Sequence, residues 1–231
     1  MTHVRSWLFT AAKKGERFQK AFASGADIVI LDLEDSVARA LKDDARRQVF
    51  SFVDSSANNA RLAIRINALV NRFGLLDLLA ASEAELAWII LPKAESPTQV
   101  EQIRKLCPKS RIAALIESAR GISTAFEIAR GGADALIFGA ADYSSEMGLD
   151  CVWKTLLFAR ARIVEAAVLA GVPVIDTPFF SIAEPDALSS EARAARSHGF
   201  SGKAAIHPAQ IDAINAAFSP SEEDLRWARA T

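Results

Sequence analysis

Acidic residues that end apolar segments are the part of this sequence best suited to chemistry. Glu117 closes the apolar segment 111–117, and Asp142 closes the segment 133–142. On neighbouring strands the two carboxylates would repel each other, so either the pKa of one rises or a cation joins them. Two oxygen ligands with open positions suit Mg²⁺ or Mn²⁺ better than zinc, which prefers His and Cys. The alternative is a polar rim, in which both carboxylates cap helices or pair with basic residues.

Arg65 is the basic residue best placed to assist such a site. It follows alternating apolar residues in the segment 61–67, so its side chain is expected to point toward the same end of the strands. A guanidinium at that position can bind a carboxylate in bidentate fashion and stabilise the negative charge of an enolate. The alternative, which can hold at the same time, is an internal ion pair with Glu34 or Asp35 at the end of the segment 26–35.

Further polar groups follow other apolar segments. Lys13 and Arg17 could meet phosphates, or they could be the solvated start of a helix. His207 could act as a general base, but a proline follows it, and a hydrogen-bonded loop anchor is the favoured interpretation. Gly139, Ala140 and Ala141 lack bulk and would let a ligand approach backbone N–H groups beside the second carboxylate.

The elements that must position these residues are short apolar runs separated by amphipathic stretches. Near-continuous apolar runs are typical of parallel strands that are covered on both faces. The predicted strands lie at 6–9, 26–35, 61–67, 87–93, 111–117, 133–142, 172–179 and 202–208. Helical spacing of apolar residues predicts helices at 15–24, 43–54, 98–107, 121–130, 153–170 and 186–197, with a less regular one near 74–84. Gly171 and Gly199 are expected to end the last two of the regular helices.

About eight strand–helix units in one chain predict an α/β fold, a single (β/α)₈ TIM barrel, rather than an open doubly wound sheet. No G-x-G-x-x-G follows a strand and the sequence has no P-loop, which disfavours the nucleotide-binding forms of the open sheet. In such a barrel the catalytic groups come from the C-terminal ends of the strands and the loops that follow. The acidic and basic residues described above lie at those ends.

The whole chain fits one such domain. Its 231 residues, 51% of them hydrophobic, suffice for one substantial core spanning 1–231. A net charge of −1 without a basic stripe gives no sign of a nucleic-acid partner. No segment approaches the ~20 apolar residues that span a bilayer, and no signal peptide is convincing, so a cytoplasmic location is expected. Cys107 and Cys151 match no metal or redox spacing and are interpreted as buried or incidental thiols.

Motifs that run through nearly the whole chain carry a family resemblance. They are RSWLF at 5–9, GADIVILDLEDSV at 25–37, RIN at 65–67, LPKAES at 91–96, LIESARG at 115–121, FGAADY at 138–143, AR at 159–160, IDTPF at 175–179, GFSGKAAIHPAQI at 199–211 and FSPSEED at 218–224. In order and spacing they resemble the citrate lyase β-subunit family, the citrate lyase-like branch of the HpcH/HpaI aldolase superfamily. The resemblance implies a (β/α)₈ barrel that assembles as a homotrimer or a larger homo-oligomer.

The resemblance also implies an activity and the residues that carry it. Members of the family cleave or form β-hydroxyacyl-CoA thioesters. Glu117 and Asp142 are expected to hold Mg²⁺, with Mn²⁺ as an alternative, and Arg65 is expected to meet the keto acid or the thioester oxygen. The backbone of Gly139 and Ala140 is expected to help bind the keto-acid carboxylate.

The reaction implied is a retro-Claisen cleavage that gives acetyl-CoA and a 2-keto acid. Citramalyl-CoA is the favoured substrate, and citryl-CoA and malyl-CoA stay open. Glu34 and Asp35 match the acidic pair that the family places near its arginine. Two alternatives are a non-catalytic barrel subunit or binding module of a larger assembly, and a metal-dependent aldolase on free hydroxy-keto acids. Aldolases of that kind often have a histidine after the second strand, where this chain has LEDSV at 33–37.

Two departures from the family pattern affect the expected site. The turn after the first strand reads LFTAAKKGE at 8–16 instead of containing proline-glycine, which leaves open whether Lys13 and Arg17 contact the coenzyme. The C-terminal lid that usually follows the FSPSEED segment is expected to be absent. In several members the lid supplies a catalytic aspartate to a neighbouring subunit. Either Asp35 substitutes for that acid here, or the protein works differently.

Overall fold

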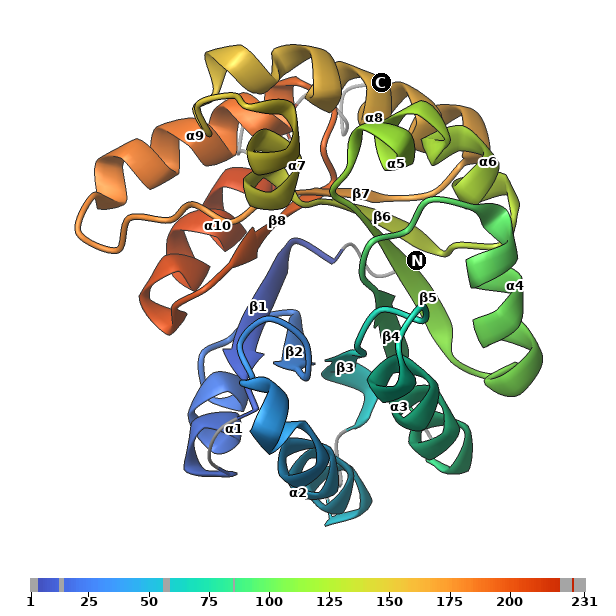
Figure 1. Ribbon diagram of the computed structural model, residues 1–231. Helices are drawn as coiled ribbons and strands as arrows, with labels where there is room; N and C mark the ends of the chain where they lie inside the picture. Colours follow the sequence, from blue (N-terminus) through green and yellow to red (C-terminus); the bar gives the residue numbers. More distant parts are fainter. Residues whose placement is uncertain (1–3, 13–14, 56–58, 85, 221–225, 227–231) are drawn as a thin grey trace.

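Eight parallel strands close into a barrel in chain order, which confirms the predicted (β/α)₈ fold (Figure 1). The computed structural model describes the chain except for residues 1–3, 13–14, 56–58, 85, 221–225 and 227–231. The strands are β1 (Ser6–Ala11), β2 (Ile28–Asp32), β3 (Leu62–Arg65), β4 (Trp88–Leu91), β5 (Arg111–Ile116), β6 (Ala135–Phe138), β7 (Val174–Asp176) and β8 (Gly202–Ala205). Each predicted apolar run overlaps one of these strands.

Helices surround the barrel and cover the outer faces of its strands (Figure 1). They are α1 (Gly15–Phe22), α2 (Lys42–Ser55), α3 (Arg72–Glu83), α4 (Pro97–Leu106), α5 (Ala119–Ser123), α6 (Ala125–Arg130), α7 (Ala140–Met147), α8 (Leu157–Ala170), α9 (Pro185–Ser197) and α10 (Ile211–Phe218). Gly171 ends α8 in a left-handed conformation, as predicted. Gly199, also with positive φ, follows the C-cap of α9. No helix in the described part of the chain is both long and apolar enough to cross a membrane.

Alternate strand positions point into the barrel, and tryptophans close one of its ends. Trp7 comes from the start of β1 and Trp88 from the start of β4, and their rings meet edge to face with centroids 5.0 Å apart. Both side chains belong to the interior cluster, which is separate from the larger core between strands and helices. Because these rings fill the barrel interior at its N-terminal end, the interior is expected to open to ligands at the C-terminal ends of the strands.

Several predicted strands end earlier than expected, and two of these ends bear on the site. β6 stops at Phe138, so Asp142 lies in the first turn of α7 rather than on the strand. β2 stops at Asp32, so Glu34 and Asp35 belong to the loop that follows it. The carboxylates of Asp35 and Asp142 therefore reach the barrel mouth from a loop and from the start of a helix.

The prediction of one continuous helix at 121–130 is also wrong. It is two short helices, α5 and α6, that meet at Thr124. The Thr124 hydroxyl donates to the carbonyl oxygens of Glu95 and Arg120, at 3.0 and 2.9 Å. The contact with Glu95 comes from a distant part of the chain and holds the junction against the preceding loop.

Candidate active site

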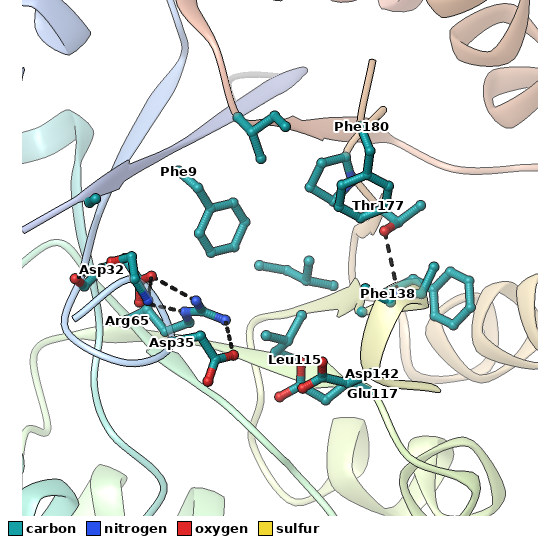
Figure 2. A pocket seen from close by; sticks show the side chains of 18 residues that line it. Phe9, Asp32, Asp35, Arg65, Leu115, Glu117, Phe138, Asp142, Thr177 and Phe180 are labelled. Atoms are coloured by element: carbon teal, nitrogen blue, oxygen red, sulfur yellow. Dashed lines mark hydrogen bonds and ion pairs between the residues drawn. The ribbon is translucent and has the colours of Figure 1, made fainter. Parts of the chain in front are cut away.

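A cavity of about 470 Å³ opens at the C-terminal end of the barrel (Figure 2). Its apolar wall is formed mainly by Phe9, Leu115, Ile137, Phe138 and Phe180. Its polar side chains are Asp32, Asp35, Ser36, Arg65, Glu117, Asp142 and Thr177. The structure thus brings the predicted Arg65, Asp35, Glu117 and Asp142 to one cavity, together with Asp32, which was not among the predicted site residues.

Asp32 is the principal partner of Arg65. The two residues lie opposite each other in the register of β2 and β3, and the guanidinium donates two hydrogen bonds of 2.7 Å, from Nε and Nη2, to the Asp32 carboxylate. Strand parity could have identified Asp32, because Ile28 and Ile30 point into the barrel and Asp32 continues that alternation. The predicted internal ion pair of Arg65 thus exists, but with Asp32 as its closest partner.

Glu34 and Asp35 complete the acidic surroundings of Arg65. Nη1 of Arg65 lies 3.0 Å from Glu34, an ion pair without hydrogen-bond alignment, and 3.8 Å from Asp35. Burial lowers the pKa of the guanidinium, but the hydrogen bonds and charge of Asp32 outweigh it and raise that pKa above its ordinary value. Burial likewise raises the pKa of Asp32, and the hydrogen bonds from Arg65 reverse the shift and lower it. Arg65 therefore stays charged, with part of its edge turned to the cavity (Figure 2).

The loop after β2 is wrapped around Asp32. Its carboxylate accepts the backbone N–H groups of Glu34 and Ser36, at 2.9 and 3.2 Å. Lys42 closes the loop from the start of α2 by donating Nζ to the carbonyl oxygens of Leu33 and Glu34, at 2.9 and 2.8 Å. This loop leaves the Glu34 side chain buried and the Asp35 side chain more than half exposed beside the cavity. Glu34 is not part of the cavity wall, so it acts on the site through its neighbours.

Glu117 is a buried carboxylate with an altered pKa. Burial, together with the negative charges of Glu34 and Asp142, raises the pKa of Glu117 to about 8. One hydrogen bond, from the backbone N–H of Lys93 to Oε1 at 2.8 Å, and the charge of Arg65 offset part of this shift. A carboxylate in this state is stabilised strongly by a bound cation.

The second predicted metal ligand, Asp142, faces the same cavity from the first turn of α7 (Figure 2). Gly139, just before that helix, permits the close approach: a Cβ there would lie 2.5 Å from Cβ and 2.8 Å from Oε2 of Glu117. Across the described residues there is no cluster of three or more His, Cys, Asp or Glu side chains that could hold a metal. Two carboxylates with room beside them fit a hard divalent cation that takes its other ligands from water and substrate.

The first two of the predicted backbone donors, Gly139 and Ala140, already have acceptors within the protein. Gly139 and Ala140 line the cavity, but the N–H of Gly139 donates to Ile116 O at 2.9 Å and that of Ala140 to the Thr177 hydroxyl at 3.3 Å. The next two amides of α7, those of Ala141 and Asp142, have no acceptor among the described residues. As first-turn amides of a helix they are suited to bind a carboxylate.

The remaining described residues considered in the sequence lie away from the cavity or have structural roles. His207 accepts the N–H of Ala209 through Nδ1 at 3.2 Å, which confirms the loop-anchor interpretation. Arg17 is exposed on α1, and Lys13 lies outside the described residues. Cys107 is buried and Cys151 is exposed, and both are free thiols.

Asp176 ends β7 but points away from the cavity, into a buried ion cluster between the strands and the helices. It accepts Nε of Arg160 at 3.0 Å and Nζ of Lys203 at 2.6 Å. Lys203 also donates to Glu191 and to the carbonyl oxygen of Thr177, both at 2.8 Å. The cluster therefore supports the β7 end from which the Thr177 hydroxyl reaches the start of α7.

Replacing Asp176 with asparagine should destabilise the protein by about 3–5 kcal/mol, because the variant leaves two buried cations short of a counter-charge. Urea denaturation followed by circular dichroism measures the loss. Glu191→Gln is the matched control, since the Glu191 side chain is partly exposed and Lys203 keeps its other partners. That control should lose less than about 1 kcal/mol. Equal losses in the two variants would contradict a dominant role for Asp176.

Sequence comparison matches residues 5–208 to the family model described as HpcH/HpaI aldolase/citrate lyase. A "Citrate lyase subunit beta-like protein" of Mycobacterium tuberculosis is 38% identical, with 96% of this chain and 82% of the relative aligned. The match runs through every residue of the cavity described above.

Solved structures agree with the sequence comparison. RipC from Yersinia pestis superposes with a TM-score of 0.85 at 40% identity, covering 96% of this chain and 98% of that one. CitE of Mycobacterium tuberculosis, in complex with magnesium, acetoacetate and coenzyme A, has a TM-score of 0.87 at 36% identity, covering 99% of this chain and 86% of that one. Both structures share the barrel and resemble this chain over nearly its full length.

Proposed function

Since this chain belongs to the HpcH/HpaI aldolase/citrate lyase family and is a lyase, we propose that it cleaves a β-hydroxyacyl-CoA into acetyl-CoA and a 2-keto acid. The observation that carries the proposal is the convergence of Glu117, Asp142 and Arg65 on one cavity at the barrel mouth. Coenzyme A and a keto acid are then the ligands. The magnesium, acetoacetate and coenzyme A bound by a relative of the same fold support this assignment.

Glu117 and Asp142 are the residues that would hold Mg²⁺. The raised pKa of Glu117, the close approach at Gly139 and the oxygen-only donor set support the fit. A divalent cation at this position supplies Lewis-acid polarisation of the substrate hydroxyl and carboxylate and lowers the pKa of that hydroxyl.

The protein groups around the cation would carry the remaining tasks. The amides of Ala141 and Asp142 hold the carboxylate of the keto-acid portion. Asp35 takes the hydroxyl proton; the electron pair of the broken carbon–carbon bond passes to the acetyl-CoA enolate, and the hydroxyl carbon becomes the ketone. Arg65 stabilises the charge on the enolate oxygen. The protonated Asp35 then returns the proton to the enolate carbon, which yields acetyl-CoA.

The cavity favours a keto acid with one carboxylate. Of the described residues that line it, Arg65 is the one cation, and Asp32 and Glu34 already engage it. A second carboxylate, as in oxaloacetate, would meet acidic side chains and the apolar wall without a free positive charge. The methyl group of pyruvate fits an apolar wall better, so citramalyl-CoA is the proposed substrate.

Keto-acid release measures this preference. The protein with Mg²⁺ is incubated separately with citramalyl-CoA, citryl-CoA and malyl-CoA. The kcat/KM for citramalyl-CoA should exceed that for citryl-CoA by at least about tenfold. A free hydroxy-keto acid serves as the control for the aldolase alternative and should not turn over. Absence of turnover of all three thioesters by folded protein would refute the proposed activity.

We further propose a homo-oligomer in the cytoplasm. Support for association comes from exposed apolar side chains on and before α3, namely Val70, Leu75, Leu76 and Leu79. Sedimentation velocity distinguishes a monomer from a trimer or larger assembly.

Lys13 and Arg17 stay candidates for contacts with the coenzyme phosphates.

A further inference from the structure

Lys93, in the loop after β4, contacts both Glu117 and Glu34 in the candidate site. Its backbone φ is +50°, and of the residues that the structure describes it is the one non-glycine with a positive φ. A left-handed conformation costs a residue with a side chain roughly 1–2 kcal/mol, and such strain concentrates at functional positions. The contacts made by its backbone and by its ammonium explain why it is held there.

The conformation of Lys93 directs two successive backbone N–H groups at β5 and at the residue that follows it. The N–H of Lys93 donates to Oε1 of Glu117 at 2.8 Å, and the N–H of Ala94 donates to the carbonyl oxygen of Leu115 at 3.1 Å. Along an extended strand, successive N–H groups point to opposite sides. Since φ and ψ of Lys93 are the only free torsions between these two amides, an unusual conformation at Lys93 is what allows both bonds.

The side chain of Lys93 turns to the other half of the site. Its Nζ donates to Oε1 of Glu34 at 2.8 Å, and Oε2 of Glu34 lies 3.0 Å from Nη1 of Arg65. A glycine would adopt the same backbone without strain, but it would leave the buried Glu34 carboxylate with less counter-charge. Lysine at this position therefore contacts both Glu117 and the Glu34–Arg65 ion pair.

We propose that Lys93 is a positioning residue with two separable tasks. Its left-handed backbone fixes Oε1 of Glu117, which orients the rest of that carboxylate toward Asp142 and a shared cation. Its ammonium holds Glu34, which keeps the Arg65 guanidinium in place beside the cavity. The inference rests on the proposed function and adds to it a residue that does not line the cavity at the barrel mouth.

A substitution series separates the backbone task from the side-chain task. Lys93→Gly and Lys93→Asn tolerate the left-handed backbone but lack the ammonium, Lys93→Val lacks both, and Lys93→Arg keeps the charge. Isothermal titration of Mg²⁺ in the presence of pyruvate should give affinities of the Gly and Asn variants within about threefold of wild type, whereas the Val variant loses about 10- to 100-fold.

Turnover at saturating Mg²⁺ reports on the side-chain task. The Gly and Asn variants should lose about tenfold in kcat with little change in KM, and the Arg variant should retain most of the rate. Thermal melts establish that each variant is folded. If the Val variant fails to fold, Lys93→Ala takes its place, because alanine tolerates the left-handed region better than valine. The Mg²⁺ affinity of the Ala variant should lie below that of the Gly variant.

Three other outcomes of these measurements would each contradict one part of the proposal. Equal Mg²⁺ affinity in the Gly and Val (or Gly and Ala) variants would refute the backbone task. Affinity lost equally in the Gly, Asn and Val variants would show that the ammonium, rather than the backbone, controls the cation site. A wild-type protein that binds no Mg²⁺ would overturn the proposed function itself, which is a different failure.

Discussion

Replacing Glu117 with glutamine should reduce turnover by at least about 10³-fold, because the variant loses a charged ligand of the proposed cation site. The substitution keeps the shape of the side chain and an oxygen that can accept the Lys93 amide. Mg²⁺ at a hundredfold excess over its Kd should stabilise the wild-type protein by about 2.7 kcal/mol and the variant by almost nothing. Keto-acid release and melting temperatures with and without Mg²⁺ measure both effects.

The same substitution should stabilise the metal-free protein at alkaline pH. The pKa of Glu117 is raised from 4.5 to about 8 in the folded state. A raised folded pKa means that the stability contributed by the protonated carboxyl is fully present below about pH 4.5 and is lost as pH rises through about 8. Glutamine cannot ionise, so near pH 9 the variant should be more stable than metal-free wild type by a few kcal/mol, roughly 3–5.

The matched control is Glu146→Gln, one turn beyond Asp142 on α7. Glu146 is exposed, and it accepts the N–H of Ala119 at 3.1 Å rather than facing the apolar wall of the cavity. This variant should keep both turnover and the Mg²⁺ response. If Glu117→Gln retains the Mg²⁺-dependent shift, Glu117 is not the cation ligand assigned here. If its metal-free stability follows that of wild type from pH 5 to 9, the pKa of Glu117 is not raised in the folded protein.

The strands could be predicted from sequence because burial on both faces imposes nearly continuous apolar runs. The ends of these elements could not, because they depend on contacts with distant segments. The run at 133–142 stays apolar while the backbone changes from strand to helix at Gly139, where the Glu117 side chain leaves no space for a Cβ. The break at Thr124 likewise depends on a hydrogen bond to the carbonyl oxygen of Glu95.

Residue type predicted which side chains line the cavity better than it predicted which side chains they contact. Arg65, Glu117 and Asp142 were selected as polar residues near strand ends, and the structure brings them to one cavity. Asp32 was missed because the more conspicuous acidic pair follows it, although the parity of β2 points it into the barrel. The role inferred for Lys93 could not be predicted, because a positive φ at a lysine has no sequence signature and arises from tertiary contacts.

Replacing Arg65 with lysine should lower kcat by about 10²- to 10³-fold, the usual loss when a donor to a developing oxyanion is removed. An ammonium cannot reproduce the bidentate contact with Asp32 and still present an N–H edge to the cavity. The guanidinium also lies over the Phe9 ring, 5.1 Å from its centroid, which helps to orient it. Steady-state kinetics with the preferred thioester measures the loss, and a retained kcat would contradict a role for Arg65 in the reaction.

Arg65 has a structural role as well, and a double substitution separates it from catalysis. Arg65→Met leaves the Asp32 carboxylate buried without its counter-charge, which should cost about 3–5 kcal/mol at neutral pH. In wild type the pKa of Asp32 is lowered, so its contribution is present above its unfolded pKa and lost as pH falls through the folded value. In the variant, burial alone raises that pKa, so the deficit should shrink in acid as Asp32 becomes neutral.

Adding Asp32→Asn to Arg65→Met removes the unpaired charge while keeping an acceptor for the Glu34 amide. The double variant should therefore recover most of the lost stability in urea denaturation, because position 32 is no longer charged and Glu34 keeps the hydrogen bond from Lys93. It should not recover turnover, since the cation facing the cavity is still missing. Recovery of stability and activity together would mean that Arg65 serves only to neutralise Asp32. Recovery of stability alone assigns the guanidinium to the chemistry and Asp32 to holding it in place.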